Sequence, residues 1–98
     1  MSDAPVTEYA LALADGERGG ALAYAGGVLR MACERSHPPG QPLTVTLQLP
    51  AGSVTVQGKS ARSKRREDSR FEVELRLHSL RREQREQLEQ AFAAAPQP

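Results

Sequence analysis

Three residues of this chain, Cys33, His37 and His78, have side chains of the types that perform nucleophilic catalysis or bind metal ions. A cysteine beside a histidine forms a nucleophile–base pair, and the same two side chains are zinc ligands. Nothing in the sequence places the three together, no oxyanion-binding element is visible, and their spacing matches no metal site. We therefore expect Cys33 to be a small apolar strand residue and both histidines to be solvated. The sequence predicts no catalytic, cofactor-binding or metal-binding residue, no cofactor and no enzymatic activity.

Glycines gather in the first third of the chain, at positions 16, 19, 20, 26 and 27. A phosphate-binding loop needs Gly-x4-Gly-Lys-Ser/Thr, and the only lysines are Lys59 and Lys64. We therefore expect these glycines to form turns between strands.

Basic residues concentrate in the second half of the chain. Residues 59–85 carry ten basic and five acidic residues, whereas residues 1–20 carry one basic and four acidic residues. Guanidinium and ammonium groups bind phosphates and carboxylates, so this region predicts an anion-binding or partner-binding surface. The alternative is a solvated hairpin tip that keeps sheet edges apart. The candidate binding residues are Arg62, Lys64, Arg65, Arg66, Arg70, Arg81, Arg82 and Arg85.

The elements that would position these residues follow from the spacing of apolar side chains. Leu43, Val45, Leu47 and Leu49 alternate with polar residues, which is typical of a half-buried strand. Similar patterns predict strands at 6–14, 21–25, 28–33, 43–49, 54–62 and 71–78. A helix is expected at 80–95, capped by Ser79, with its first arginines where the helix dipole prefers anions. Short connections favour a mainly β fold, a small six-stranded antiparallel barrel with one C-terminal helix.

Length and composition limit the classes of protein that the chain can represent. Its 98 residues carry 13 basic and 12 acidic side chains, a net charge of +1, which excludes a polycation. We expect one domain at residues 6–95, between disordered tails at 1–5 and 96–98. One cysteine excludes an intrachain disulfide. The sequence shows no signal peptide and no apolar run that could insert into a membrane, so we expect a cytoplasmic protein.

The order of segments across residues 6–93 matches a known domain. The segments that carry the match are Gly27-Val28-Leu29-Arg30-Met31, the Pro39-Gly40 turn that leads into the strand ending at Leu49-Pro50, Val54-Thr55-Val56-Gln57-Gly58, Arg70-Phe71-Glu72-Val73-Glu74-Leu75, and the helix that begins near Ser79. This order resembles the PilZ domain, a six-stranded antiparallel barrel with a C-terminal helix.

The resemblance also implies which ligand to test, since many PilZ domains bind cyclic di-GMP. They use Arg-x3-Arg in an N-terminal arm and a downstream Asp/Asn-x-Ser-x-x-Gly. When Gly27 is matched to the last glycine, Leu22 and Tyr24 stand where the polar residues belong, and only Arg18 lies upstream. The resemblance therefore points to the branch that lacks the nucleotide motif, whose members resemble adaptors in type IV pilus or motility control.

The function expected from the sequence is that of a non-enzymatic PilZ-like adaptor that docks a protein with an acidic surface. One alternative is a cyclic di-GMP receptor that grips phosphate with Arg62 and Arg66, which have the Arg-x3-Arg spacing. Another is a small barrel that binds single-stranded nucleic acid. We do not expect nucleic-acid binding, because no aromatic residue lies among the basic ones to stack on a base.

Overall fold

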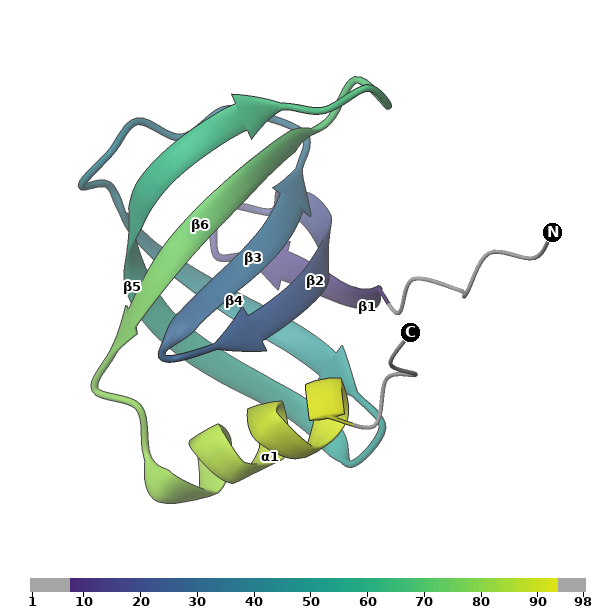
Figure 1. The fold of residues 1–98 in the computed structure, drawn as a ribbon, viewed down its shortest axis with the longest axis vertical. Helices are drawn as coiled ribbons and strands as arrows, with labels where there is room; N and C mark the ends of the chain where they lie inside the picture. Colours follow the sequence, from purple (N-terminus) through teal and green to yellow (C-terminus); the bar gives the residue numbers. More distant parts are fainter. Residues whose placement is uncertain (1–7, 94–98) are drawn as a thin grey trace, which may run out of the picture.

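The computed structural model describes residues 8–93, which form six strands and one helix (Figure 1). The elements are β1 (Tyr9–Leu13), β2 (Arg18–Ala25), β3 (Val28–Cys33), β4 (Pro42–Leu49), β5 (Gly52–Arg65), β6 (Phe71–His78) and α1 (Arg82–Ala93). The strands close into a barrel in the order β1-β2-β3-β6-β5-β4, and every neighbouring pair is antiparallel. The predicted six-stranded barrel with a C-terminal helix is confirmed.

The barrel closes because each strand turns its apolar residues to the same side. On β4, Val45, Leu47 and Leu49 are buried, while Thr46 and Gln48 between them face outward. Such alternation places one row of side chains inside and the other row in solvent. The interior is filled by side chains: the largest fully buried ones include Leu29, Met31, Leu47, Leu75, Val45 and Val73.

Several strand boundaries differ from the sequence prediction. β5 continues to Arg65 rather than ending near residue 62, because it stays paired with β6 beyond a register shift between Ser60 and Arg62. β2 begins at Arg18, so Gly19 belongs to a strand and not to a turn. A Cβ on Gly19 would collide with the backbone oxygen of Ala32 on β3, which explains a glycine there. β1 spans Tyr9–Leu13, and the expected residues 6 and 7 lie outside the described ones, as do both predicted tails.

The helix lies across one end of the barrel, opposite the end that carries the β5–β6 connection (Figure 1). It is anchored by Leu88, which is fully buried, and by the Tyr9 hydroxyl, which donates to the carbonyl of Ala91 at 2.8 Å. The rings of Tyr9 and Phe92 meet edge to face, with centroids 5.2 Å apart. The described helix ends at Ala93, and expected residues 94 and 95 lie beyond the described part of the chain.

The prediction that Ser79 caps the helix is wrong. The helix begins at Arg82, and Arg81 occupies the cap position because its carbonyl accepts the N–H of Arg85. The Gln84 side chain does the capping: its Oε1 accepts the N–H of Arg81 at 3.0 Å. Its Nε2 donates to the carbonyl of Thr55 at 2.8 Å and so ties the helix to β5. Among residues 8–93, no helix is long and apolar enough to cross a membrane.

Candidate functional site

The structure separates the predicted basic residues into two groups. Arg62, Lys64 and Arg65 lie on β5, and Arg66 and Arg70 lie in the connection to β6. The other group, at the start of α1, consists of Arg81, Arg82 and Arg85. The β5–β6 connection and the helix lie at opposite ends of the barrel (Figure 1). The two groups therefore do not form one compact basic patch.

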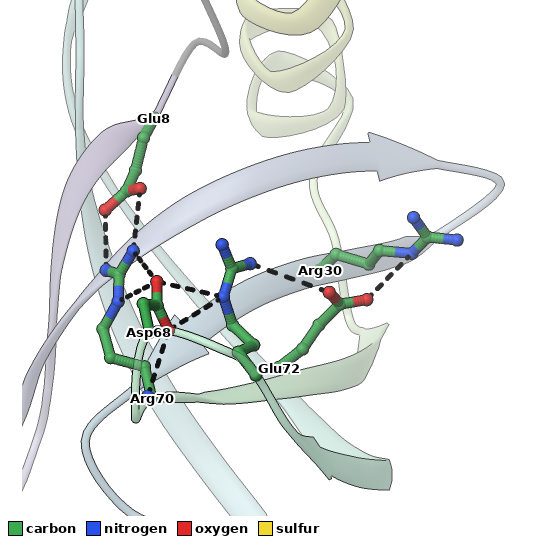
Figure 2. A network of polar contacts seen from close by, with 6 residues as sticks. Glu8, Arg30, Asp68, Arg70 and Glu72 are labelled. Atoms are coloured by element: carbon green, nitrogen blue, oxygen red, sulfur yellow. Dashed lines mark hydrogen bonds and ion pairs between the residues drawn. The ribbon is translucent and has the colours of Figure 1, made fainter.

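Two of the candidate arginines are engaged in ion pairs that hold the β5–β6 connection (Figure 2). Arg70 contacts Glu8 at 2.9 Å and Asp68 at 3.1 Å. Arg66 contacts Asp68 at 3.3 Å and Glu72 at 3.7 Å. The hydrogen bond from the Arg70 side chain lowers the pKa of Glu8, and the hydrogen bond from the backbone N–H of Arg70 lowers the pKa of Asp68. Arg66 and Arg70 thus serve the fold of this connection.

A different set of cations shares the outer face of β3, β6 and β5. Cross-strand partners point to the same side of a sheet, and the register pairs Arg62 with Glu74 and Lys64 with Glu72. It also pairs Lys59 with Arg76, two like charges directly opposite each other. We call this surface the β5–β6 cationic face. Its basic residues, all exposed, are Arg30, Lys59, Arg62, Lys64 and Arg76.

This face has a net charge of +3, since the five cations surround only Glu72 and Glu74. Among the described residues, no ion pair joins Lys59, Arg62 or Lys64 to a carboxylate, whereas Arg30 pairs with Glu72 at 3.8 Å. Arg30, Lys59 and Arg76 are absent from the candidate residues predicted from the sequence. Arg30 and Arg76 lie beside Arg62 because of the strand order β3-β6-β5, whereas Lys59 lies on β5 itself. The alternation of β6 in the sequence predicts that Arg76 faces outward, and it is exposed.

The cations at the helix start border two open cavities. Arg85 lines one of about 600 Å³ together with Tyr24, Leu77 and Leu80. Arg81 lines a second of about 310 Å³, beside the exposed His78. Arg82 is highly exposed and pairs with Glu86 one turn later, at 3.7 Å.

His37 is buried, so the prediction that it is solvated is wrong, whereas His78 is exposed as expected. Residues 34–41, between β3 and β4, fold against β5: the N–H of Gly40 donates to the carbonyl of Ser60 at 2.7 Å, and the N–H of His37 donates to the hydroxyl of Ser63 at 3.3 Å. The ring is held on both sides. Its Nε2 is 3.0 Å from Oε1 of Glu17, and its Nδ1 is 3.2 Å from Oε1 of Gln41.

The structure also brings Cys33 to this histidine, which the sequence did not indicate. Ligand atoms of Glu17, Cys33 and His37 all lie within 4.8 Å of one another, and all three residues are buried. Glu17 comes from the turn before β2, Cys33 ends β3, and His37 lies in the following connection. Pairing of Gly19 with Cys33 aligns the first two elements. Sequence spacing contains no sign of this, because the three residues meet only when the barrel closes.

The geometry of this cluster does not make Cys33 a nucleophile. Burial, reinforced by the negative charge of Glu17, raises the pKa of its thiol to about 12. The reactive form of a cysteine is the thiolate, which is therefore scarce at neutral pH. The Glu17 carboxylate is held by the backbone N–H of Arg35 at 2.9 Å, and Arg35 extends to Asp15 at the surface, also at 2.9 Å.

The molecule thus offers an exposed cationic face, open cavities beside the helix and a buried polar cluster. Comparison of the chain with protein-family models, with curated proteins and with solved structures found no match to any of them.

Proposed function

We propose that this protein is a non-enzymatic binding module that docks an acidic protein surface through the β5–β6 cationic face. The observation that carries the proposal is the set of five exposed cations around two carboxylates on one side of the barrel. Lys59 and Arg76 repel each other across the two strands. An acidic partner would relieve this repulsion, and complementary charge would steer the two proteins together.

The rigidity of this face favours recognition of a folded partner. Its side chains project from paired strands, whose positions are set by backbone hydrogen bonds, rather than from a loop. The sequence predicts that this strand ends near residue 62, with Lys64, Arg65 and Arg66 in the charged connection after it. β5 is longer than predicted, so Lys59, Arg62 and Lys64 all project from a strand, which fixes the spacing between them. This arrangement suits a partner with acidic groups at matching spacing.

The wider proposal is that of a PilZ-like adaptor in the bacterial cytoplasm that acts in type IV pilus or motility control. It rests on the resemblance in segment order, and a six-stranded barrel with a helix after β6 is the architecture that this resemblance implies.

Two other binding modes receive less support from the structure. Recognition of cyclic di-GMP by Arg62 and Arg66 would require Arg66 to leave Asp68 and Glu72. Nucleic-acid binding would need an aromatic platform beside the cations. The described aromatic residues pack instead against the barrel core: they are Tyr9, Tyr24, Phe71 and Phe92.

The experiment compares two triple variants with the wild-type chain as affinity baits in a lysate of the native host. In the first, Lys59, Arg62 and Lys64 are changed to Ser; in the matched control, Arg81, Arg82 and Arg85 are changed to Ser. We expect specific partners to be absent from the first variant and retained by the control. We also expect rising salt to elute them from the wild-type chain. Both variants should keep the wild-type melting temperature, since all six side chains are exposed.

Retention of every partner by the first variant would refute the role of this face. Calorimetry with cyclic di-GMP and with single-stranded RNA separates the alternatives. Stoichiometric binding of either ligand by the wild type, with loss of binding in Arg62→Ser, would replace the adaptor proposal.

A further inference from the structure

We propose that Glu17, Cys33 and His37 form a binding site for a transition-metal ion of the zinc type. The three residues offer one carboxylate oxygen, one sulfur and one imidazole nitrogen, and these atoms lie within 4.8 Å of one another. Four-coordinate zinc holds its ligands about 3.3–3.8 Å apart, at metal–ligand distances of ~2.0–2.3 Å. The atoms are therefore close to the required spacing, and shifts of about 1 Å would complete it.

The hydrogen bonds around His37 leave the right nitrogen for a metal. Oε1 of Gln41 lies 3.2 Å from Nδ1, and this contact orients the ring so that Nε2 faces Glu17. In most metal–histidine sites, the ring nitrogen that does not bind the metal is hydrogen-bonded to another group, which orients the imidazole ring. Glu17 is held in the same manner, since its Oε2 accepts the backbone N–H of Arg35 at 2.9 Å and its Oε1 faces the histidine.

The contact between Nε2 of His37 and Oε1 of Glu17 is one that a metal ion can replace. The two atoms are 3.0 Å apart in a buried place. A proton satisfies this contact in the metal-free protein. A metal ion satisfies it equally, and the sulfur of Cys33 then supplies the third ligand.

The charge of the cluster favours replacement of a proton by a metal ion. Binding of a divalent ion displaces the thiol proton of Cys33, and the resulting thiolate and the Glu17 carboxylate offset the two charges of the ion. This neutralisation lowers the cost of burying the ion. The Arg35 guanidinium lies 3.4 Å from Oε1 of Glu17, the oxygen offered to the metal, so an ion would have to displace it. Arg35 is largely exposed and also pairs with Asp15 at 2.9 Å, so its side chain can turn outward to Asp15 when the ion binds.

The ligand set selects the class of metal. Thiolate and imidazole bind Zn²⁺ and Co²⁺ well, whereas Mg²⁺ and Ca²⁺ prefer sites made of oxygen alone. Access is provided by residues 34–41, most of which are exposed and which form the outer wall of the cluster. Local opening of such a connection admits an ion without unfolding the barrel.

The test titrates the whole purified chain, freed of metal by a chelator, with Co²⁺ and Zn²⁺. We expect one equivalent of Co²⁺ to bind and to produce the near-ultraviolet absorption of a cobalt–thiolate bond, and we expect Zn²⁺ to displace it. Cys33→Ala should abolish this absorption, and Gln41→Ala should weaken metal binding by about 10–100-fold, as loss of a supporting hydrogen bond does. The matched control, His78→Gln, removes the exposed histidine and should change nothing.

Absence of the thiolate absorption in the wild type would overturn the proposal, and this readout does not depend on the folding of any variant. Binding that persists in Cys33→Ala but disappears in His78→Gln would also overturn it, because the ion would then sit on the surface. A melting temperature of the wild type that does not change with Zn²⁺ would also overturn it, because the cluster would then be only a group of buried, hydrogen-bonded side chains.

Discussion

Replacement of Leu88 by Ala should destabilise the whole domain, because this side chain joins the helix to the barrel core. Leu88 is fully buried and belongs to the same apolar cluster as residues from all six strands. The other anchors of α1 are smaller or only partly buried: Ala91, Phe92 and the hydroxyl of Tyr9. The substitution therefore removes the main apolar contact between α1 and the barrel.

The expected magnitude follows from the atoms removed. Leu and Ala differ by three carbon groups, and burial of each stabilises by about 0.8 kcal/mol, which amounts to about 2.4 kcal/mol. The cavity left behind adds to this value, and measured Leu→Ala changes span about 2–5 kcal/mol. Because a helix at the end of a barrel can settle inward, we expect about 3 kcal/mol for Leu88→Ala. A domain of this size has about 5–15 kcal/mol in total, so the change is large.

The assay is urea unfolding at 25 °C, followed by circular dichroism and compared with two controls. Gln90→Ala alters an exposed position on the same helix and should stay within about 0.5 kcal/mol of the wild type. Leu88→Met conserves volume and should cost less than about 1.5 kcal/mol. A loss of under 0.5 kcal/mol in Leu88→Ala would refute the reasoning, since it would mean that the helix does not seal the barrel.

Three further predictions concern the strands, the thiol and the ion pairs. Gly58→Ala should lower the free energy of unfolding by about 1–3 kcal/mol or more, because the new Cβ would lie 2.8 Å from the carbonyl carbon of Arg76 on β6. Urea unfolding checks this, with Gln57→Ala as the control. Iodoacetamide should modify Cys33 about 1000-fold more slowly in the folded chain than in the unfolded chain at pH 8, because burial raises the thiol pKa from 9.0 to about 12; rates within tenfold of each other would contradict this. The lowered pKa of Glu8 contributes stability that is present above its ordinary value of 4.5 and is lost as the pH falls through the lower folded value. Arg70→Ala should remove this acid-dependent contribution, which we expect to be about 1 kcal/mol or less because the pair is at the surface; equal slopes of stability against pH below 4.5 in both proteins would argue against it.

The architecture could be predicted because it depends on local periodicity. The alternation of Val45, Leu47 and Leu49 with threonines is visible in the sequence, and so is the same pattern in β6. Short connections then force antiparallel neighbours, and a single apolar face closes on itself. Element ends were less predictable: Gly19 appears as a turn residue, although close approach to β3 places it in a strand.

The candidate surface could be predicted only in part. The excess of basic residues in the second half is a property of the sequence. The outward position of Arg62 and Lys64 is not, because alternation from the buried Val54 and Val56 would turn both inward, whereas the register shift between Ser60 and Arg62 turns them outward. The pairing of Arg66 and Arg70 with carboxylates could not be predicted, because Glu8 lies 62 positions away from Arg70. Whether a cation is exposed for a partner or engaged in the fold depends on such distant contacts.

The sequence by itself thus determined the strands, the helix and the distribution of charge, since each depends on residues near one another along the chain. Only the tertiary structure decided which cations share a face and that Glu17, Cys33 and His37 meet. The physical reason is that barrel closure sets the register between strands, and the register brings together side chains whose spacing in the sequence carries no signal.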